Sequence, residues 1–258
     1  MANNAAPRPG QTYLSFNGTR SFVEIANRPE YSVDFADALT VAAWMRADVE
    51  RFPKPEAGQL YVHWMGKGQQ SGDTGDQEWV FRMYDKPAPE PDGDRSKRTS
   101  FYLFNPRGGL GVGSYVQEDV PVKTWRLIVG VADDRRTRLY RNGELTHCDT
   151  YRGVGTTRCP IMLDNGQQVV IFPEHGGAPL RIGTQNLGSY FQGGITRVRI
   201  WTRALAADEI LAVYEADEAP RDALVAEFRL DSDTGTRAVD SSPLANHGVI
   251  KDGIWARQ

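Results

Sequence analysis

The sequence lacks the features that mark membrane-spanning and conventionally exported proteins. No apolar run reaches the ~18 residues that a transmembrane helix needs, so no membrane span is expected. The opening segment, residues 1–10, contains neither an apolar stretch nor a positively charged start and does not form a signal peptide. The compartment stays open: cytoplasmic or particle-associated, or extracellular if an export segment was removed.

An excess of charge of one sign is also missing. The chain has 30 Lys and Arg against 33 Asp and Glu, which gives a formal net charge of −3. Nucleic acid and anionic membranes attract proteins that carry many basic residues. We therefore expect neither of these partners.

Cysteine is scarce. The chain contains Cys148 and Cys159 alone, which are too few for a structural zinc site, and no His pair lies at ligand spacing beside them. A disulfide between them requires an oxidising compartment. We expect the two thiols to be free and buried.

Glycine, proline and aromatic residues are plentiful. With 26 Gly, 15 Pro, six Trp and 40% hydrophobic residues, the 258-residue chain is typical of one turn-rich globular domain with a core. Short apolar-alternating runs separated by Gly, Pro, Asn and Asp predict many strands. The expected strands are Tyr13–Phe16, Phe22–Ile25, Leu39–Asp48, Leu60–Met65, Glu78–Tyr84, Ser100–Phe104, Leu110–Tyr115, Trp125–Ala132, Thr137–Arg141, Leu180–Gly183, Thr196–Trp201 and Leu224–Leu230.

A few segments have other signatures. Asn142-Gly143 predicts a type I′ hairpin turn, because both residues tolerate positive φ angles. Ala206–Ala216 has apolar residues at helical spacing, and we expect this helix to cap one end of the sandwich. Lys86–Lys97 and Cys159–Pro179 are long loops, which are either ligand-contacting or mobile.

Several segments, taken in order, resemble a known family. They are Tyr13–Gly18, Phe22–Ile25, Leu39–Trp44, Trp125–Gly130, Arg138–Leu145, Leu180–Gly183, Phe191–Ile195 and Arg199–Leu205. Their succession resembles the laminin-G-like, concanavalin A-like jelly roll over nearly the whole chain. The resemblance implies an all-β fold, a two-sheet antiparallel jelly-roll sandwich with one short capping helix near the C-terminal end.

The same resemblance implies the domain organisation. Residues 1–10 are expected to form a flexible N-terminal arm, and residues 11–258 a single laminin-G-like domain. Leu224–Asp231 resembles a piece that often precedes the opening strands in this family, but here it lies near the end of the chain. A jelly roll brings its first and last strands together, so we expect Val249–Trp255 to pack beside Gly10–Phe16. The alternative is that the tail begins a further repeat.

One face of the sandwich is a candidate binding surface. Within Glu78–Tyr84, alternation places Trp79, Phe81 and Met83 on the core side. The other side would combine aromatic rings with polar groups, as carbohydrate binding requires, since sugar C–H faces stack on rings and hydroxyls need hydrogen-bond partners. The candidate ligand-binding residues are Trp64, Lys67, Arg82, Tyr84 and Tyr102. The alternative is that these side chains pack in the core.

No metal site is assigned from the sequence. Calcium is the metal that the family resemblance implies, and Asn17, Asp231 and Asp240 lie in turns where their oxygens could bind it. Thr196 and Arg197 stand where the family commonly has acidic residues, and Asn or Asp in turns often bonds to its own backbone instead.

Three functions remain open. The family resemblance favours a non-catalytic binding module for carbohydrate recognition or adhesion. The alternative is a structural or docking subunit of a larger particle, such as a phage tail or contractile injection system, with a protein partner. A polysaccharide-degrading enzyme ranks third, because no expected strand carries the paired carboxylates of a glycosidase and Tyr190–Gly194 resembles only part of a lyase motif. We therefore expect a glycan or protein partner and no catalytic residue.

Overall fold

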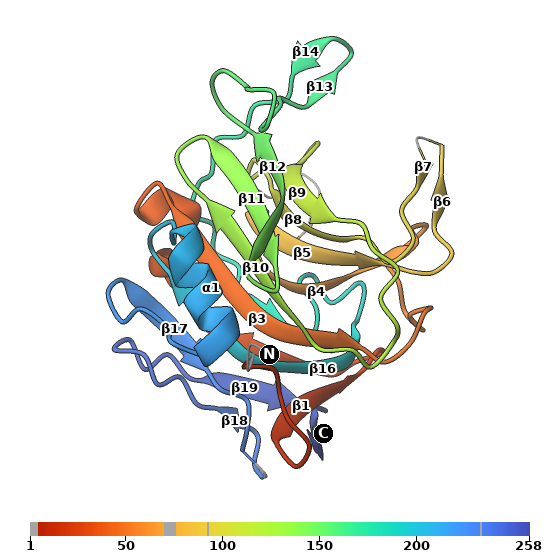
Figure 1. Cartoon of the computed structure of the whole chain (residues 1–258), viewed down its shortest axis with the longest axis vertical. Helices are drawn as coiled ribbons and strands as arrows, with labels where there is room; N and C mark the ends of the chain where they lie inside the picture. Colours follow the sequence, from red (N-terminus) through yellow and green to blue (C-terminus); the bar gives the residue numbers. More distant parts are fainter. Residues whose placement is uncertain (1–4, 70–75, 92, 233) are drawn as a thin grey trace.

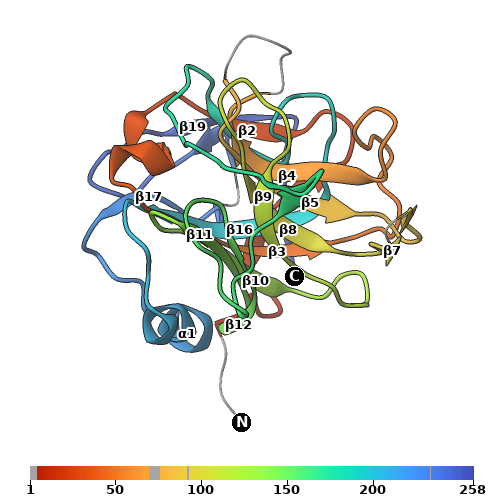
Figure 2. The ribbon, with the colours of Figure 1, turned by 90° about the horizontal axis from the view of Figure 1, so that it is seen from above.

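The computed structural model describes residues 5–69, 76–91, 93–232 and 234–258. Within these ranges the chain folds into two eight-stranded antiparallel sheets that face each other, with a helix outside one of them. Seen from above, the layers follow one another as helix, first sheet and second sheet (Figure 2). The predicted two-sheet sandwich is confirmed.

The first sheet has the order β12-β11-β10-β3-β16-β1-β20, and β17 also pairs with β16. Its strands are β1 (Thr12–Asn17), β3 (Leu39–Ala47), β10 (Arg126–Ala132), β11 (Arg136–Arg141), β12 (Glu144–Thr150), β16 (Gln192–Trp201), β17 (Leu224–Phe228) and β20 (Ile254–Arg257).

The second sheet has the order β18-β19-β2-β15-β4-β5-β8-β9. Its strands are β2 (Phe22–Ile25), β4 (Tyr61–Lys67), β5 (Trp79–Tyr84), β8 (Thr99–Leu103), β9 (Val112–Val116), β15 (Leu180–Ile182), β18 (Arg237–Ala238) and β19 (Gly248–Lys251). The two long loops each contain a short hairpin, formed by β6 (Pro89–Glu90) with β7 (Gly93–Asp94) and by β13 (Leu163–Asp164) with β14 (Gln167–Gln168). Two 3₁₀ turns, η1 (Pro29–Tyr31) and η2 (Val33–Phe35), follow β2.

The main core lies between the two sheets, and strand alternation explains which side chains fill it. Trp79, Phe81 and Met83 all enter this core, as the sequence predicts. On β8, whose pattern was ambiguous, Phe101 and Leu103 point inward. The intervening side chains therefore project from the outer face of the second sheet.

Helix α1 (Ala207–Ala216) covers the outer face of the first sheet, instead of one end of the sandwich as expected (Figure 1). The reason is a second apolar cluster on that face, which β3, β10 and β16 present. Ile210 and Val213 of the helix are buried in it, and Trp44 stacks on Tyr214 at 5.8 Å between ring centroids. Alternation along β3 does not reveal that the helix covers this face.

The two chain ends lie against the first sheet. β20 pairs with β1 in antiparallel register, with Trp255 opposite Leu14. The N–H of Gly10 donates to the carbonyl of Gln258 at 3.1 Å, and the N–H of Ala5 donates to the carbonyl of Tyr214 on α1 at 2.7 Å. The described part of the N-terminal arm is therefore hydrogen-bonded to the domain.

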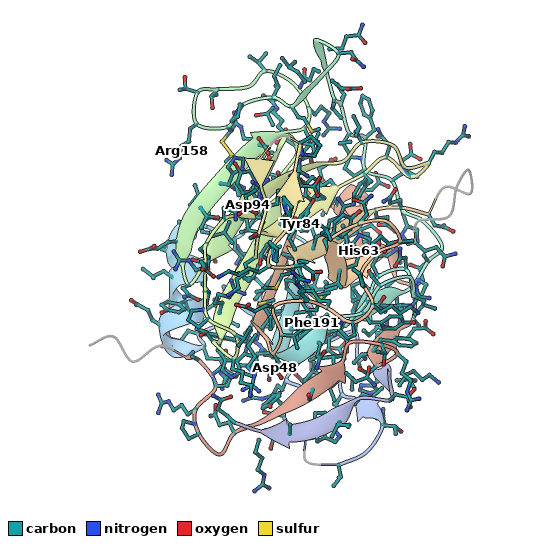
Figure 3. All side chains as sticks on the ribbon, turned by 90° about the vertical axis from the view of Figure 1, so that its right-hand side faces the viewer. Asp48, His63, Tyr84, Asp94, Arg158 and Phe191 are labelled. Atoms are coloured by element: carbon teal, nitrogen blue, oxygen red, sulfur yellow. A yellow bond between two sulfur atoms is a disulfide. The ribbon has the colours of Figure 1, made fainter. Side chains whose placement is uncertain are left out.

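The two cysteines form a disulfide, so the expectation of free thiols is wrong. Cys148 on β12 is bonded to Cys159, with their Cα atoms 4.7 Å apart (yellow bond in Figure 3). An isolated bridge between Thr150 and Ile161 turns the following loop back against β12 and brings the two residues together. A spacing of eleven residues alone does not reveal such a return.

The Asn142-Gly143 turn is confirmed, with φ angles of 52° and 85°. This turn joins β11 to β12, a strand that the sequence analysis did not predict. No helix in the described ranges is long and apolar enough to cross a membrane.

Candidate functional site

The outer face of the second sheet carries a concentration of aromatic and arginine side chains. Strand pairing sets Tyr61 opposite Tyr84, and Arg82 opposite Ser100, which in turn lies opposite Tyr115. Residues directly opposite one another in a sheet project from the same face. We call this surface the tyrosine–arginine face and define it by Tyr61, Arg82, Tyr84, Tyr102 and Tyr115. The second sheet, unlike the first, has no helix over it in the described ranges.

Arg82 is the centre of the face. Its guanidinium carbon lies 4.8 Å from the ring centroid of Tyr61, 4.9 Å from that of Tyr102 and 5.2 Å from that of Phe104. Its Nε donates to Nε2 of His63 at 3.2 Å. Ring faces attract a guanidinium through their quadrupoles, so the side chain is held in place by aromatic rings and an imidazole.

His63 positions Arg82 from the neighbouring strand β4, where it lies directly opposite Arg82 on the same face. The His63 side chain is fully buried, and its Nδ1 lies 3.3 Å from Oε2 of Glu56. Hydrogen bonding to His63 lowers the pKa of Glu56 to about 2, and burial lowers the pKa of His63. The imidazole is therefore neutral, with its proton on the Nδ1 that faces the carboxylate and a lone pair on Nε2 that accepts from Arg82. Tyr84 and His63 are labelled in Figure 3.

Two further arginines border the face. Arg95 donates from Nη1 to the hydroxyl of Tyr84 at 3.1 Å. Arg98 lies over the ring of Tyr115 at 4.3 Å, and that ring stacks on His147 of β12 with 4.2 Å between centroids. The aromatic surface thus continues from the second sheet onto β12 of the first.

Glycine makes room for one of the rings. Gly113 lies opposite Tyr102, and a Cβ at Gly113 would stand 2.7 Å from Cγ of that ring and 2.2 Å from the carbonyl oxygen of Phe101. No larger residue fits without moving the backbone. The Tyr102 ring can therefore lie close to the sheet, half-buried, with part of its surface exposed.

Three of the five sequence-predicted binding residues, Arg82, Tyr84 and Tyr102, belong to this face, although only 4% of Tyr84 is exposed. Trp64 and Lys67 do not. Trp64 is fully buried against Phe81 and Phe191 in the main core. Tyr61 and Tyr115 were missed.

Lys67 was misplaced because it is buried with a counterion. It is fully buried and pairs with Glu78, and its ammonium also lies within hydrogen-bonding distance of the carbonyls of Gly176 and Ala178. A β-bulge between His63 and Met65 shifts the pairing of β4 and places Trp64 and Met65 in the core together. Simple alternation cannot anticipate this shift.

The three candidate calcium ligands do not fit a calcium site. Oδ1 of Asn17 accepts the backbone N–H groups of the turn that follows it, and both Asp240 oxygens accept bonds from β17 and from residues 242 and 246. Asp231 pairs with Arg229 at 3.1 Å. Their oxygens are thus engaged with donors, and no group of three or more His, Cys, Asp or Glu side chains in the described ranges could hold a metal ion.

A cleft lies at one end of the sandwich. Between the 105–110 turn and the β13–β14 hairpin is a cleft of about 290 Å³ lined by Asn105, Asp164, Gln167 and Gln168. Its rim includes Leu110, and the neighbouring loops expose Val154, Leu163 and Phe172. The 159–179 loop was expected to be either ligand-contacting or mobile. If it contacts a ligand, this cleft is the place where it would do so.

Asp149, on the strand that extends the face, makes a pH-dependent contribution to stability. Burial raises its pKa from 3.8 to about 6, so it contributes stability below pH 4 that is lost as the pH rises through 6. Oδ2 lies 3.6 Å from Nδ1 of His147, but burial lowers the pKa of that imidazole, which leaves it neutral at pH 7 and unable to compensate the charge.

We therefore expect Asp149→Asn to raise the free energy of unfolding at pH 7.5 by roughly 1–3 kcal/mol and to change it little at pH 3.5. Urea denaturation at the two pH values measures this. The exposed Asp164→Asn is the control and should change neither. A gain of equal size at both pH values would contradict the assignment to Asp149 ionisation.

The family is settled by sequence. A family model described as the concanavalin A-like lectin/glucanases superfamily matches residues 17–211, which is most of the chain. The chain belongs to this superfamily. The predicted laminin-G-like resemblance is thereby confirmed, and the match includes all five residues of the tyrosine–arginine face.

Solved structures share the superfamily fold with this member at low identity. A Bacteroides ovatus protein proposed to bind carbohydrate aligns with a TM-score of 0.60 at 13% identity, over 97% of this chain and 61% of that one. A heptameric SAP-like pentraxin from Limulus polyphemus aligns with a TM-score of 0.57 at 13% identity, over 98% of both chains. A comparison with curated protein sequences gave no match.

Proposed function

We propose that the protein is a non-catalytic carbohydrate-binding module that binds glycan on the tyrosine–arginine face. One observation carries this proposal: partly exposed Tyr61 and Tyr102 flank the Arg82 guanidinium on a sheet face that no described helix covers. Sugar rings present C–H faces that pack on aromatic rings, while their hydroxyls need fixed donors. The face offers both kinds of contact.

Family membership and fold support the proposal. The superfamily includes lectins by its description, and the Bacteroides ovatus protein with a similar fold is itself proposed to bind carbohydrate. Two acids on or near this sheet are not free carboxylates: Glu56 lies against His63, and Glu24 farther along the sheet is paired with Arg181. A glycosidase would need two such groups with access to the sugar.

The disulfide bears on where the protein works. Disulfides persist in oxidising compartments and are rare in the cytosol. We expect the Cys148–Cys159 bond to reflect an exported protein, and glycans are abundant ligands outside the cell.

We expect Tyr102→Ala to weaken glycan binding at least about tenfold, because a stacked ring contributes on the order of 1 kcal/mol or more to such a contact. A glycan array with wild-type protein identifies the ligand, and calorimetry on the best hit measures the loss. Tyr102→Phe keeps the ring and should retain most of the affinity. Gln168→Ala in the end cleft is the positional control and should bind as wild type.

Two outcomes would contradict the proposal. Loss of binding in Gln168→Ala with retention in Tyr102→Ala would move the site to the end cleft. An array without hits, in the presence of calcium and of EDTA alike, would favour the second candidate function. That candidate is docking to a protein partner, and the exposed Val154, Leu163 and Phe172 at the end of the sandwich favour it.

A further inference from the structure

We infer that the tyrosine–arginine face selects glycans that carry a carboxylate, which Arg82 and Arg98 bind. This inference rests on the proposed function and specifies its ligand. It follows from the unused hydrogen-bonding capacity of the two guanidinium groups and from the placement of the nearby acids.

The Arg82 guanidinium has N–H donors that no described residue accepts. In the described ranges its only hydrogen bond is the one from Nε to His63, and it pairs with no carboxylate. Arginine has five N–H donors in a planar fork, so the two terminal nitrogens of Arg82 are available. Such a fork matches both oxygens of a carboxylate.

Arg98, which immediately precedes β8, repeats this arrangement. Its Nε donates to the amide oxygen of Gln117 at 2.7 Å, and it makes no ion pair with a described residue. It is half-buried and lies over the Tyr115 ring. Each of the two cations is therefore oriented by a neutral acceptor and a ring face, which leaves its terminal nitrogens for a ligand.

The surroundings of Arg82 make an anion favourable. The guanidinium is half-buried among Tyr61, Tyr102 and Phe104, where water screens charge less than at an open surface. The positive charges of Arg82, Arg95 and Arg98 all act to lower the pKa of Tyr102, although burial outweighs them and raises it. Three arginine side chains therefore lie close enough to act on this hydroxyl.

The acids near the face form their hydrogen bonds with groups other than the terminal nitrogens of Arg82 and Arg98. Glu56 is engaged by His63 and Asn186, and Asp94 accepts bonds from Ser96 within its own turn. The Ser100 hydroxyl, in register between Arg82 and Tyr115, is buried without a partner. The accessible donors of the face are therefore basic, and an acidic sugar supplies acceptors for them.

Carboxylate and sulfate share the chemistry that arginine recognises, but a planar carboxylate pairs with one guanidinium through two parallel bonds. The half-buried setting of Arg82 between flat rings suits a planar group on a sugar ring. We therefore assign the ligand to carboxylated sugars, such as uronic acids, and treat sulfated glycans as the competing class.

The test compares matched probes by calorimetry on the full chain. The probes are oligomers of galacturonic, glucuronic and mannuronic acid, each beside its carboxyl-reduced neutral counterpart, and dextran sulfate beside dextran. We expect at least one acidic oligomer to bind about tenfold or more tightly than its neutral counterpart. The preference should decrease with added NaCl, because salt screens the charge interaction.

Matched variants assign the preference to the face. Arg82→Gln should remove most of the preference for the acidic probe, and Arg98→Gln, which keeps Arg82, should reduce it. Arg82→Lys should restore only part of it, because the ammonium lacks the fork. Arg237→Gln on β18 removes one charge from an exposed position away from the face and should leave the preference unchanged. If Arg82→Gln does not fold, as judged by its melting curve, Arg98→Gln still provides the test.

The outcomes separate this inference from the proposed function. Equal affinity for an acidic oligomer and its neutral counterpart would overturn the carboxylate assignment and leave carbohydrate binding standing. Tighter binding of dextran sulfate than of every carboxylated probe would also overturn it. If the preference for the acidic probe survives both Arg82→Gln and Arg98→Gln, the carboxylate does not bind on this face. Absence of binding to any acidic, neutral or arrayed glycan would overturn the proposed function itself.

Discussion

Replacing Glu78 with glutamine is expected to lower the free energy of unfolding by about 3–5 kcal/mol at pH 7, the cost of leaving a buried charge without its counterion. The charge is Lys67, whose side chain is fully buried; burial lowers its pKa, and the nearby Glu78 carboxylate opposes that shift. Glu78 also accepts the backbone N–H of Gly176 at 3.0 Å. The pair therefore anchors the second half of the 159–179 loop to the ends of β4 and β5.

Thermal unfolding followed by circular dichroism measures this effect. For a domain of this size, the loss corresponds to a decrease in melting temperature of roughly 6–20 °C. The control is Glu144→Gln, since Glu144 is an exposed acid whose contact with Arg141 is 3.9 Å long. Exposed pairs contribute little, so that variant should change the free energy by less than about 1 kcal/mol.

The double replacement Lys67→Met with Glu78→Leu distinguishes charge from packing. Removing both charges avoids the uncompensated cation, so the double variant is expected to be more stable than Glu78→Gln alone. If the double variant were the less stable of the two, the loss in Glu78→Gln would come from packing or from the Gly176 hydrogen bond.

Strand positions could be read from the sequence wherever a single strand carries its own pattern. Trp79, Phe81 and Met83 alternate with polar or smaller residues, and each lies in the core. The ambiguous Phe101 and Leu103 could not be assigned, because both faces of β8 carry aromatic residues. In such a strand the inward face is decided by its neighbours in the sheet, which a one-strand pattern does not contain.

At the candidate site, too, the pattern of a single strand was not enough to place each side chain. Arg82 was predicted on β5, whose core face the alternation indicates, whereas Tyr102 was predicted on β8 although the buried face of that strand was open. Lys67 was misplaced because it follows the β-bulge, and one extra residue reverses the direction of every following side chain. Trp64 lies on the core side of β4 before the shifted register begins. Tyr115 was missed because its place beside the others depends on the pairing of β8 with β9.

The role of His63 was equally hidden. In sequence it is one of four histidines, and none of them has an obvious acid or nucleophile partner beside it. Its contact with Glu56 depends on a loop that precedes β4, and its acceptance of the Arg82 Nε bond depends on cross-strand register. The pattern of residues along one strand does not indicate a contact among Glu56, His63 and Arg82, which belong to separate segments.

Loss of the disulfide is the second large effect that we expect. Replacing both Cys148 and Cys159 with serine should lower the free energy of unfolding by about 2–3 kcal/mol, because the bond closes a loop of some ten residues and restricts the unfolded chain. Urea denaturation measures the loss. Wild-type protein in dithiothreitol should approach the double variant, and the variant itself should not respond to the reductant.

The same loop supports the end cleft but not the tyrosine–arginine face, and this difference connects stability to function. The bond lies between β12 and the segment that leads to the β13–β14 hairpin, whose Asp164 and Gln168 line the cleft. Tyr61, Arg82 and Tyr102 lie on β4, β5 and β8, which this loop does not join. Glycan affinity should therefore survive the double serine replacement at a temperature where the variant stays folded. If affinity falls together with the disulfide while the melting curve shows a folded protein, the binding site lies in the cleft.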